Sequence, residues 1–150
     1  MNLEQQINAD IKAAMLAKAA DTLNALRAIK SAILLAKTEK AGITELSPET
    51  ELAILQKLAK QRKESFELYQ KEGREDLARE EDVQLKVIEK YLPAQLSDEA
   101  LDTELKAILA QSGVTDPAGL GKVMGMATKV LAGKADNGRI AQHLRQLLTP

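Results

Sequence analysis

Apolar residues recur three or four positions apart along almost the whole sequence, and no stretch keeps the strict alternation of apolar and polar residues that is typical of a half-buried strand. Residues at this helical spacing fall on one face of an α-helix, where they can be buried together. The chain has 150 residues, of which 45% are hydrophobic and 29% charged, as in soluble globular proteins. The sequence therefore predicts an all-α fold with one ordinary domain or two small ones.

Signals for the starts and ends of helices divide the sequence into seven expected helices. Ser47 and Ser97 precede acidic residues, and Asn2 lies three positions before Gln5, so all three are expected to cap helices. Glycine is expected to end several helices, because it adopts the left-handed conformation easily. The expected helices cover about residues 3–19, a stretch after Asp21 that stops near Gly42, 48–73, 75–90, 98–111, a stretch from after Asp116 to before Gly133, and 137–148. The buried face of the second helix is expected to contain Leu23, Leu26, Ile29, Ile33 and Leu34.

The stretch "YLPAQLSDEA" is the best candidate for a boundary between two units, because a proline break is followed at once by the capping signal at Ser97. We expect an N-terminal helical bundle over residues 1–93 and a small three-helix unit over residues 94–150. The second unit is short enough to have a thin core, so it is expected to depend on a partner or on the first unit.

Several classes of site and location are excluded by composition. The chain has no cysteine, which removes disulfides, thiolate metal sites and cysteine nucleophiles. Its longest apolar run, from Ala32 to Ala36, is far too short to cross a bilayer, and the first residues lack the pattern of a targeting segment. We therefore expect a cytoplasmic protein that has no membrane partner.

A catalytic centre is hard to assemble from these residues. "GLGKVMG" lacks the spacing and the Ser or Thr of a nucleotide-binding loop, and no strand is expected before it. Amide transfer from glutamine would need a nucleophile and an ATP site, and neither is visible. The single histidine, His143, is interpreted as a packing residue at the edge of the last helix. No catalytic residue, cofactor or metal ligand is predicted.

Arg62 occupies a position in the third helix where an apolar residue is due. If this side chain is buried it needs a partner. The candidates are Glu64, Glu67, and a polar line on the second helix formed by Asn24, Arg27 and Ser31. The alternative is a solvated face with ordinary surface ion pairs.

Glycines and lysines share one flank of the helix expected between Asp116 and Gly133. At 100° per residue, Gly121 and Gly125 lie in a stripe of small residues, and Lys122 and Lys129 stand beside it. Such a flank lets the backbone approach a docked molecule closely, and the lysines suit phosphate groups. The alternative is that the stripe lets another helix of the same protein pack closely.

The charge of the C-terminal segment supports a polyanionic partner, although the net charge of the chain is only −1. Between residues 119 and 150 the bases outnumber the acids by four, since only Asp136 opposes Lys122, Lys129, Lys134, Arg139 and Arg145. The chain has one Phe, two Tyr and no Trp, which argues against a reader of single-stranded RNA that stacks bases on aromatic side chains.

Several separated motifs, in the right order, resemble the YqeY proteins. They are "LNALRAIKSAI", "KQRKESFELYQKEGREDLA", "YLPAQLSDEA", "GKVMG" and "KVLAGKADNGRI". YqeY proteins are stand-alone relatives of the tail domain of GatB, a subunit of the tRNA-dependent Asp/Glu amidotransferase. The resemblance implies a two-part helical fold and, as in the GatB tail, a role in holding tRNA. The catalytic cradle of GatB is absent from this chain. The positions that match the glycines, lysines and acid of the tail motif are Gly121, Lys122, Gly125, Lys134, Asp136 and Gly138.

Together, the residues and the resemblance predict a non-catalytic module that binds tRNA or associates with a tRNA-dependent amidotransferase, a glutamine-dependent carbon–nitrogen ligase. The expected partners are tRNA or a tRNA-processing complex. The alternative is a helical scaffold for protein–protein interaction that binds no RNA, and a third possibility is ligase activity within a complex. The candidate nucleic-acid-binding residues are Gly121, Lys122, Gly125, Lys129, Lys134, Gly138 and Arg139.

Overall fold

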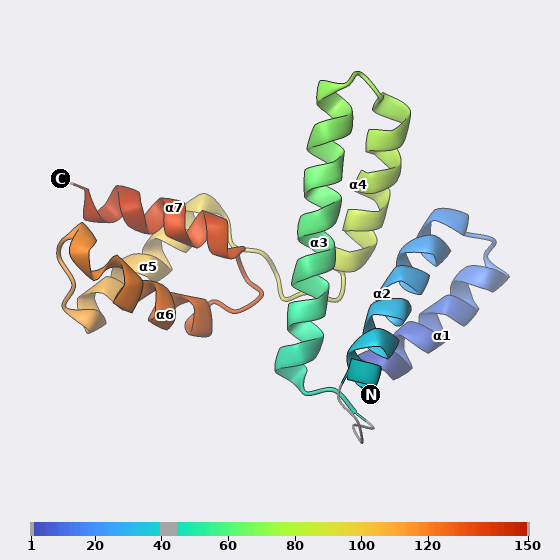
Figure 1. Ribbon diagram of the computed structural model, residues 1–150, viewed down its shortest axis with the longest axis horizontal. Coiled ribbons are helices and arrows are strands. Elements are labelled where there is room, and N and C mark those ends of the chain that lie inside the picture. Colours follow the sequence, from blue (N-terminus) through green and yellow to red (C-terminus); the bar gives the residue numbers. More distant parts are fainter. Residues whose placement is uncertain (1, 40–44, 150) are drawn as a thin grey trace. The chain divides into compact units, whose positions relative to one another are not determined.

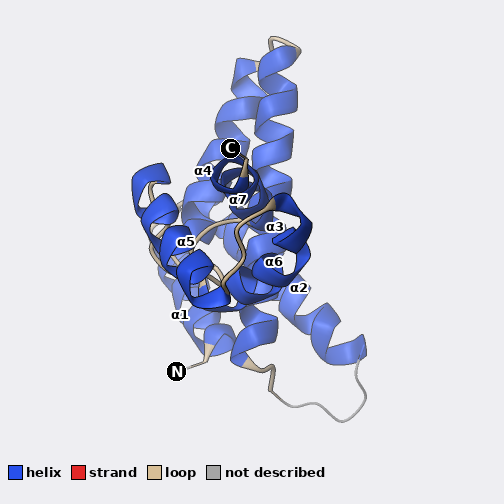
Figure 2. Ribbon diagram, turned by 90° about the vertical axis from the view of Figure 1, so that its left-hand side faces the viewer, coloured by secondary structure: helices blue, strands red, loops and turns tan. Residues whose placement is uncertain are grey.

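The computed structural model describes residues 2–39 and 45–149, and these form seven α-helices, one short 3₁₀ turn and no strand (Figure 2). The all-α prediction is therefore confirmed. The chain divides into two compact units, Met1–Leu92 and Pro93–Pro150. No helix in the described part of the chain has both the length and the apolar content to cross a membrane.

The N-terminal unit consists of two helical hairpins (Figure 1). Helices α1 (Leu3–Leu16) and α2 (Ala20–Glu39) form one pair, and α3 (Pro48–Lys71) and α4 (Glu75–Glu89) form the other. Helix α2 packs against α1, α3 and α4, so it joins the two hairpins. The residues buried in this core are Leu3, Ile7, Ala14, Ala25, Leu26, Ile29, Ile33, Leu55, Ala59, Leu85, Val87 and Ile88.

The C-terminal unit is built from α5 (Asp98–Ser112), the 3₁₀ turn η1 (Pro117–Gly119), α6 (Leu120–Val130) and α7 (Asn137–Leu148). Each of its three α-helices packs against the other two. The core residues are Leu101, Leu105, Ile108, Val123, Ala127, Leu131, Ala135, Ile140 and Leu144. This small core fixes which faces of α6 and α7 are left on the surface.

Most of the predicted helix ends are confirmed by their hydrogen bonds. Asn2 and Gln5 form a reciprocal capping box, and the hydroxyl groups of Ser47 and Ser97 accept hydrogen bonds from the backbone N–H groups of the first turns of α3 and α5. Gly113 ends α5 in the left-handed region at φ 72°. These ends were predictable because capping depends on residues close in sequence.

Other predicted boundaries were wrong by a few residues. Helix α1 ends at Leu16 rather than near residue 19, because Lys18 turns the chain with a positive φ of 55°. The helix expected after Asp116 begins as the separate turn η1, and α6 itself ends at Val130. The predicted end of the second helix near Gly42 lies outside the described residues.

The predicted buried face of the second helix was also wrong at one position. Leu26, Ile29 and Ile33 are buried, whereas the side chain of Leu34 is 45% exposed. Leu34 follows Ile33 by 100° around the helix, which turns it away from the face that α4 and α1 cover.

Arg62 is partly buried and has a partner that the sequence did not suggest. Its Nε atom lies 3.8 Å from Oε2 of Glu81 on α4, and both atoms are inaccessible to solvent. The predicted candidates on α3 and α2 form no ion pair with it among the described residues. Arg62 does have a partner, but none of the predicted candidates supplies it, because the partner comes from the other helix of the hairpin.

Candidate nucleic-acid interface

The predicted glycine–lysine flank lies on α6 and is open. Lys122, Lys129, Gly121 and Gly125 are all exposed. A Cβ atom at either glycine would have no neighbouring atom within 4 Å outside the local backbone of α6. Within the described part of the C-terminal unit this flank is therefore uncovered, and the two glycines do not serve the close packing of α5 or α7.

The opposite face of α6 explains why the lysines point outward. Val123 and Ala127 are fully buried in the core of the C-terminal unit, and Leu131 is 1% exposed directly after the helix. Since these apolar residues hold one face of α6 against α5 and α7, the flank that carries Lys122 and Lys129 remains on the surface.

The turn between α6 and α7 holds the segment that leads into α5. Gly133 is buried with a positive φ of 77°, a conformation that favours glycine. Its carbonyl accepts a hydrogen bond of 2.7 Å from the side-chain amide of Gln95, and the carbonyl of Lys134 accepts one of 2.9 Å from the N–H of Leu96. The backbone of this turn is structural, while the side chain of Lys134 is exposed.

Asp136 and Gly138 both serve the start of α7. Oδ1 of Asp136 accepts a hydrogen bond of 2.8 Å from the N–H of Arg139, which caps the helix. A Cβ at position 138 would lie 3.1 Å from the same oxygen, so Gly138 leaves room for the cap. The carboxylate of Asp136 thus occupies the N-terminus of α7, so this N-terminus is a weaker binding site for an external anion.

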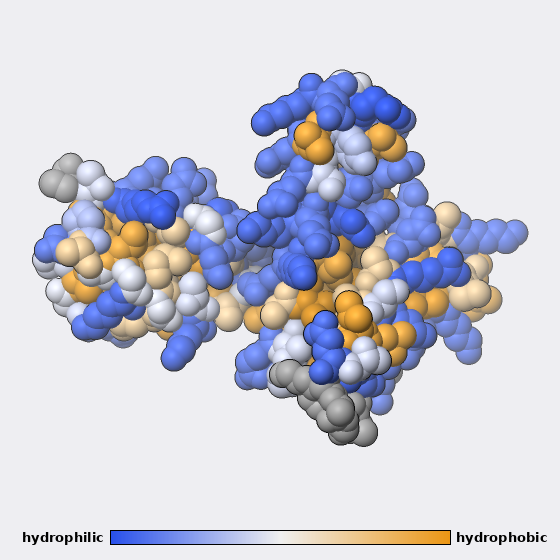
Figure 3. Space-filling model, in the orientation of Figure 1, coloured by the Kyte–Doolittle hydropathy of each residue, from blue (hydrophilic) through white to orange (hydrophobic). Residues whose placement is uncertain are grey.

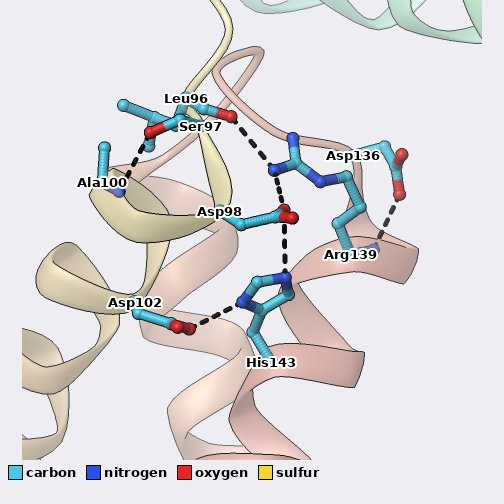
Figure 4. A network of polar contacts seen from close by, with 8 residues as sticks. All are labelled: Leu96, Ser97, Asp98, Ala100, Asp102, Asp136, Arg139 and His143. Carbon is cyan, nitrogen blue, oxygen red and sulfur yellow. Dashed lines mark hydrogen bonds and ion pairs between the residues drawn. The ribbon is translucent and has the colours of Figure 1, made fainter.

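Arg139 differs from the lysines because its guanidinium group is engaged within the unit (Figure 4). Nη2 donates hydrogen bonds to the carbonyl of Leu96 at 3.0 Å and to Oδ1 of Asp98 at 2.8 Å. The hydrogen bond from Arg139 holds the pKa of Asp98 below its usual value. Of the predicted basic residues, Lys122, Lys129 and Lys134 are exposed, whereas Arg139 joins α7 to the start of α5.

His143 lies in the same network and has two acidic neighbours. Its side chain is 13% exposed, with Nδ1 2.6 Å from Oδ1 of Asp102 and Nε2 3.4 Å from Oδ1 of Asp98 (Figure 4). Neither contact was predicted from the sequence. A signal was present, because Asp98 and Asp102 are four residues apart on one helix, and Arg139 and His143 are four apart on another.

The contacts of Arg139 and His143 hold α5 and α7 together and do not expose a reactive side chain. Both ring nitrogens of His143 face carboxylate oxygens, and the contacts connect α5 with α7. Within the described ranges, no group of three or more His, Asp or Glu side chains has an arrangement that could hold a metal ion.

Comparison with protein families matches the model described as Yqey-like protein over residues 4–148, which include nearly all of both units. The chain belongs to the YqeY family. The resemblance inferred from the separated motifs is thereby confirmed. A search of curated proteins gave no significant match. In this YqeY chain the family motif around "GKADNGR" holds the turn and the start of α7, whereas the open glycine–lysine flank has no structural use among the described residues.

Proposed function

We propose that this YqeY protein is a non-catalytic module that binds the sugar-phosphate backbone of tRNA through the flank of α6, in association with a tRNA-dependent amidotransferase. The observation that carries the proposal is the exposed pair of lysines beside two glycines that no other described part of the C-terminal unit covers. Gly125 lies in the interior of α6, where a glycine costs about 1 kcal/mol relative to alanine, and this cost calls for a compensating role.

The geometry of the flank suits a polyanionic backbone. Lys122 and Lys129 are seven residues apart, which places them about 10.5 Å apart along the helix axis and on nearly the same side. Beside the lysines, the missing side chains of Gly121 and Gly125 let a ligand come close to the helix backbone. The exposed Lys134 adds positive charge to the same unit. This arrangement supports recognition by shape and phosphate rather than by base stacking.

The proposal is tested by binding of fluorescently labelled total tRNA as a function of salt concentration. Reversing both lysines, Lys122→Glu with Lys129→Glu, is expected to weaken binding at least about tenfold and to lower the slope of log affinity against log salt by roughly two, because two phosphate contacts are lost. Lys106→Glu is the matched control, since this exposed lysine lies on α5 in the same unit. Absence of binding at low salt, or equal effects of reversal and control, contradicts the proposal.

Two further experimental outcomes would support a different function in place of tRNA binding. A protein partner that remains bound at high salt and is lost on Gly125→Leu supports the scaffold alternative, in which a partner helix packs on the flank. Amide formation on misacylated tRNA by the purified chain alone would show that the protein is catalytic.

A further inference from the structure

A second row of residues runs along α3 beside the row that packs in the core. The core row includes the buried Leu55 and Ala59 and continues to Arg62, which meets Glu81 on α4. The second row repeats at alternating intervals of four and three residues, the spacing that keeps side chains on one side of a helix over several turns. It consists of Ile54, Leu58, Gln61, Ser65 and Leu68.

This second row borders a groove that the described residues leave open. The first half of the row, with α2, forms a groove of about 280 Å³. Its walls include Leu35 of α2 and Ile54, Lys57, Leu58 and Gln61 of α3. A shallower hollow continues along α3 past Gln61 to Leu68. Leu35 is 62% exposed and Leu68 is 54% exposed. Figure 3 shows apolar surface over the lower part of α3 and the neighbouring part of α2, next to a hydrophilic stretch.

The row is self-complementary when it is read in both directions from Gln61. Seven residues before Gln61 is Ile54, and seven after it is Leu68, so antiparallel pairing of two copies places apolar against apolar. Lys57 precedes Gln61 by four residues and Glu64 follows it by three. The same pairing therefore places Lys57 of each copy near Glu64 of the other copy, which gives two contacts between opposite charges. Both charged side chains are exposed, and neither forms an ion pair with a described residue.

We propose that this face of α3 binds α3 of a second copy of the chain, antiparallel, about a twofold axis at the level of Gln61. The two Gln61 amides meet at the axis and can hydrogen-bond to each other, because each carries both donors and an acceptor. Leu68 of the second copy fills the groove beside Ile54 and Leu35. A twofold axis makes the interface closed, with the same residues contributed by each copy.

The first test is the mass of the full chain by sedimentation velocity over a wide concentration range, after nuclease treatment to remove bridging RNA. A dimer is expected, and Leu68→Glu is expected to weaken it at least about tenfold, because a charge is then buried without a partner. Leu34→Glu is the matched control, since this exposed leucine on α2 does not line the groove. A chain that is monomeric throughout, or a dimer equally sensitive to both variants, overturns the proposal.

The second test uses the predicted charge pairs. Lys57→Glu and Glu64→Lys are each expected to weaken self-association, because each variant opposes like charges at both flanks of the axis. Mixing the two variants is expected to restore a dimer, since the mixed pair again opposes unlike charges. Failure to restore the dimer overturns the antiparallel arrangement, as does capture of a different protein by the same face in place of a second copy.

The third test is a crosslink at the axis. Because the chain has no cysteine, Gln61→Cys introduces a single thiol, which is expected to form a disulfide with its counterpart in mild oxidant. The control is Leu16→Cys, at a residue that is 79% exposed in α1. Equal rates of crosslinking for the two variants contradict an axis at Gln61.

Discussion

Oδ1 of Asp102 lies 2.6 Å from Nδ1 of His143, and this contact joins the second turn of α5 to the middle of α7. The two residues are 41 positions apart in the sequence. Neighbouring side chains extend the connection, since Asp98 reaches both His143 and Arg139. The C-terminal unit therefore has a polar brace beside its small apolar core.

The Asp102–His143 contact is expected to contribute on the order of 1 kcal/mol to the stability of the C-terminal unit, because it is a hydrogen bond to a charged group that is partly exposed. A double-mutant cycle of Asp102→Ala and His143→Ala measures the coupling, with urea denaturation followed through NMR signals of this unit. The control cycle replaces His143→Ala by Arg145→Ala, an exposed residue on the same helix. Equal coupling in the two cycles would show that the contact contributes nothing specific.

The Arg139–Asp98 ion pair is expected to make stability depend on pH in the acidic range. The hydrogen bond from Arg139 lowers the pKa of Asp98 in the folded state from its ordinary value of 3.8. The contribution is therefore present above pH 3.8 and is lost as the pH falls through the lower folded pKa. Urea midpoints of the natural chain and Asp98→Asn should differ at neutral pH and converge in acid, while Glu99→Gln should show no such convergence. A difference that grows on acidification contradicts this reading.

The Arg62–Glu81 pair is expected to matter for stability mainly when one partner is removed. Arg62→Met leaves the carboxylate of Glu81 without its counter-charge, and we expect a loss of about 1–3 kcal/mol. Adding Glu81→Leu should recover most of this loss, because two apolar side chains can replace a partly buried ion pair. Lys86→Met is the control, since its ion pair with Asp82 is exposed and worth a few tenths of a kcal/mol. A double variant no more stable than the single one would argue against this account.

Replacing the glycines of α6 by alanine is expected to change protein stability and tRNA affinity in opposite directions. Gly125→Ala is expected to raise the stability of the C-terminal unit by up to about 1 kcal/mol, because a methyl group meets no neighbouring atom and alanine favours the helix interior. Gly121→Ala is expected to raise it less, because Gly121 lies in the first turn of α6. If tRNA approaches this flank closely, the same variants should bind it more weakly. Thermal unfolding and the tRNA titration measure the two effects. Unchanged affinity in stabilised variants would remove the glycines, though not the lysines, from the interface.

Local sequence signals predicted much of the fold. The last helix was predicted as residues 137–148 and spans Asn137–Leu148, because Asp136 caps it and its apolar residues keep a helical spacing. The predicted break at "YLP" coincides with the end of α4 near Glu89. The end of α1 was mispredicted because Lys18, rather than a glycine, adopts the left-handed conformation. A lysine in this conformation has no sequence signature that distinguishes it from a helical lysine.

Some features of the candidate site could also be predicted from the sequence, and others could not. The grouping of Gly121, Lys122, Gly125 and Lys129 on one flank was predictable, because they lie on one short helix whose periodicity fixes their relative directions. The role of Arg139 was not, because its partners Asp98 and Leu96 precede it by more than 40 residues.

The amino-acid sequence by itself determined that the chain is helical, where most helices begin and end, and which side of α6 carries the glycines and lysines. These properties depend on residues within one or two turns of each other. Only the tertiary structure decided that Glu81 faces Arg62, that two aspartates flank His143, that Leu34 is left outside the core, and that the flank of α6 is uncovered. Each of these depends on which helix faces pack together, and that choice is made by the burial of whole apolar faces rather than by any local signal.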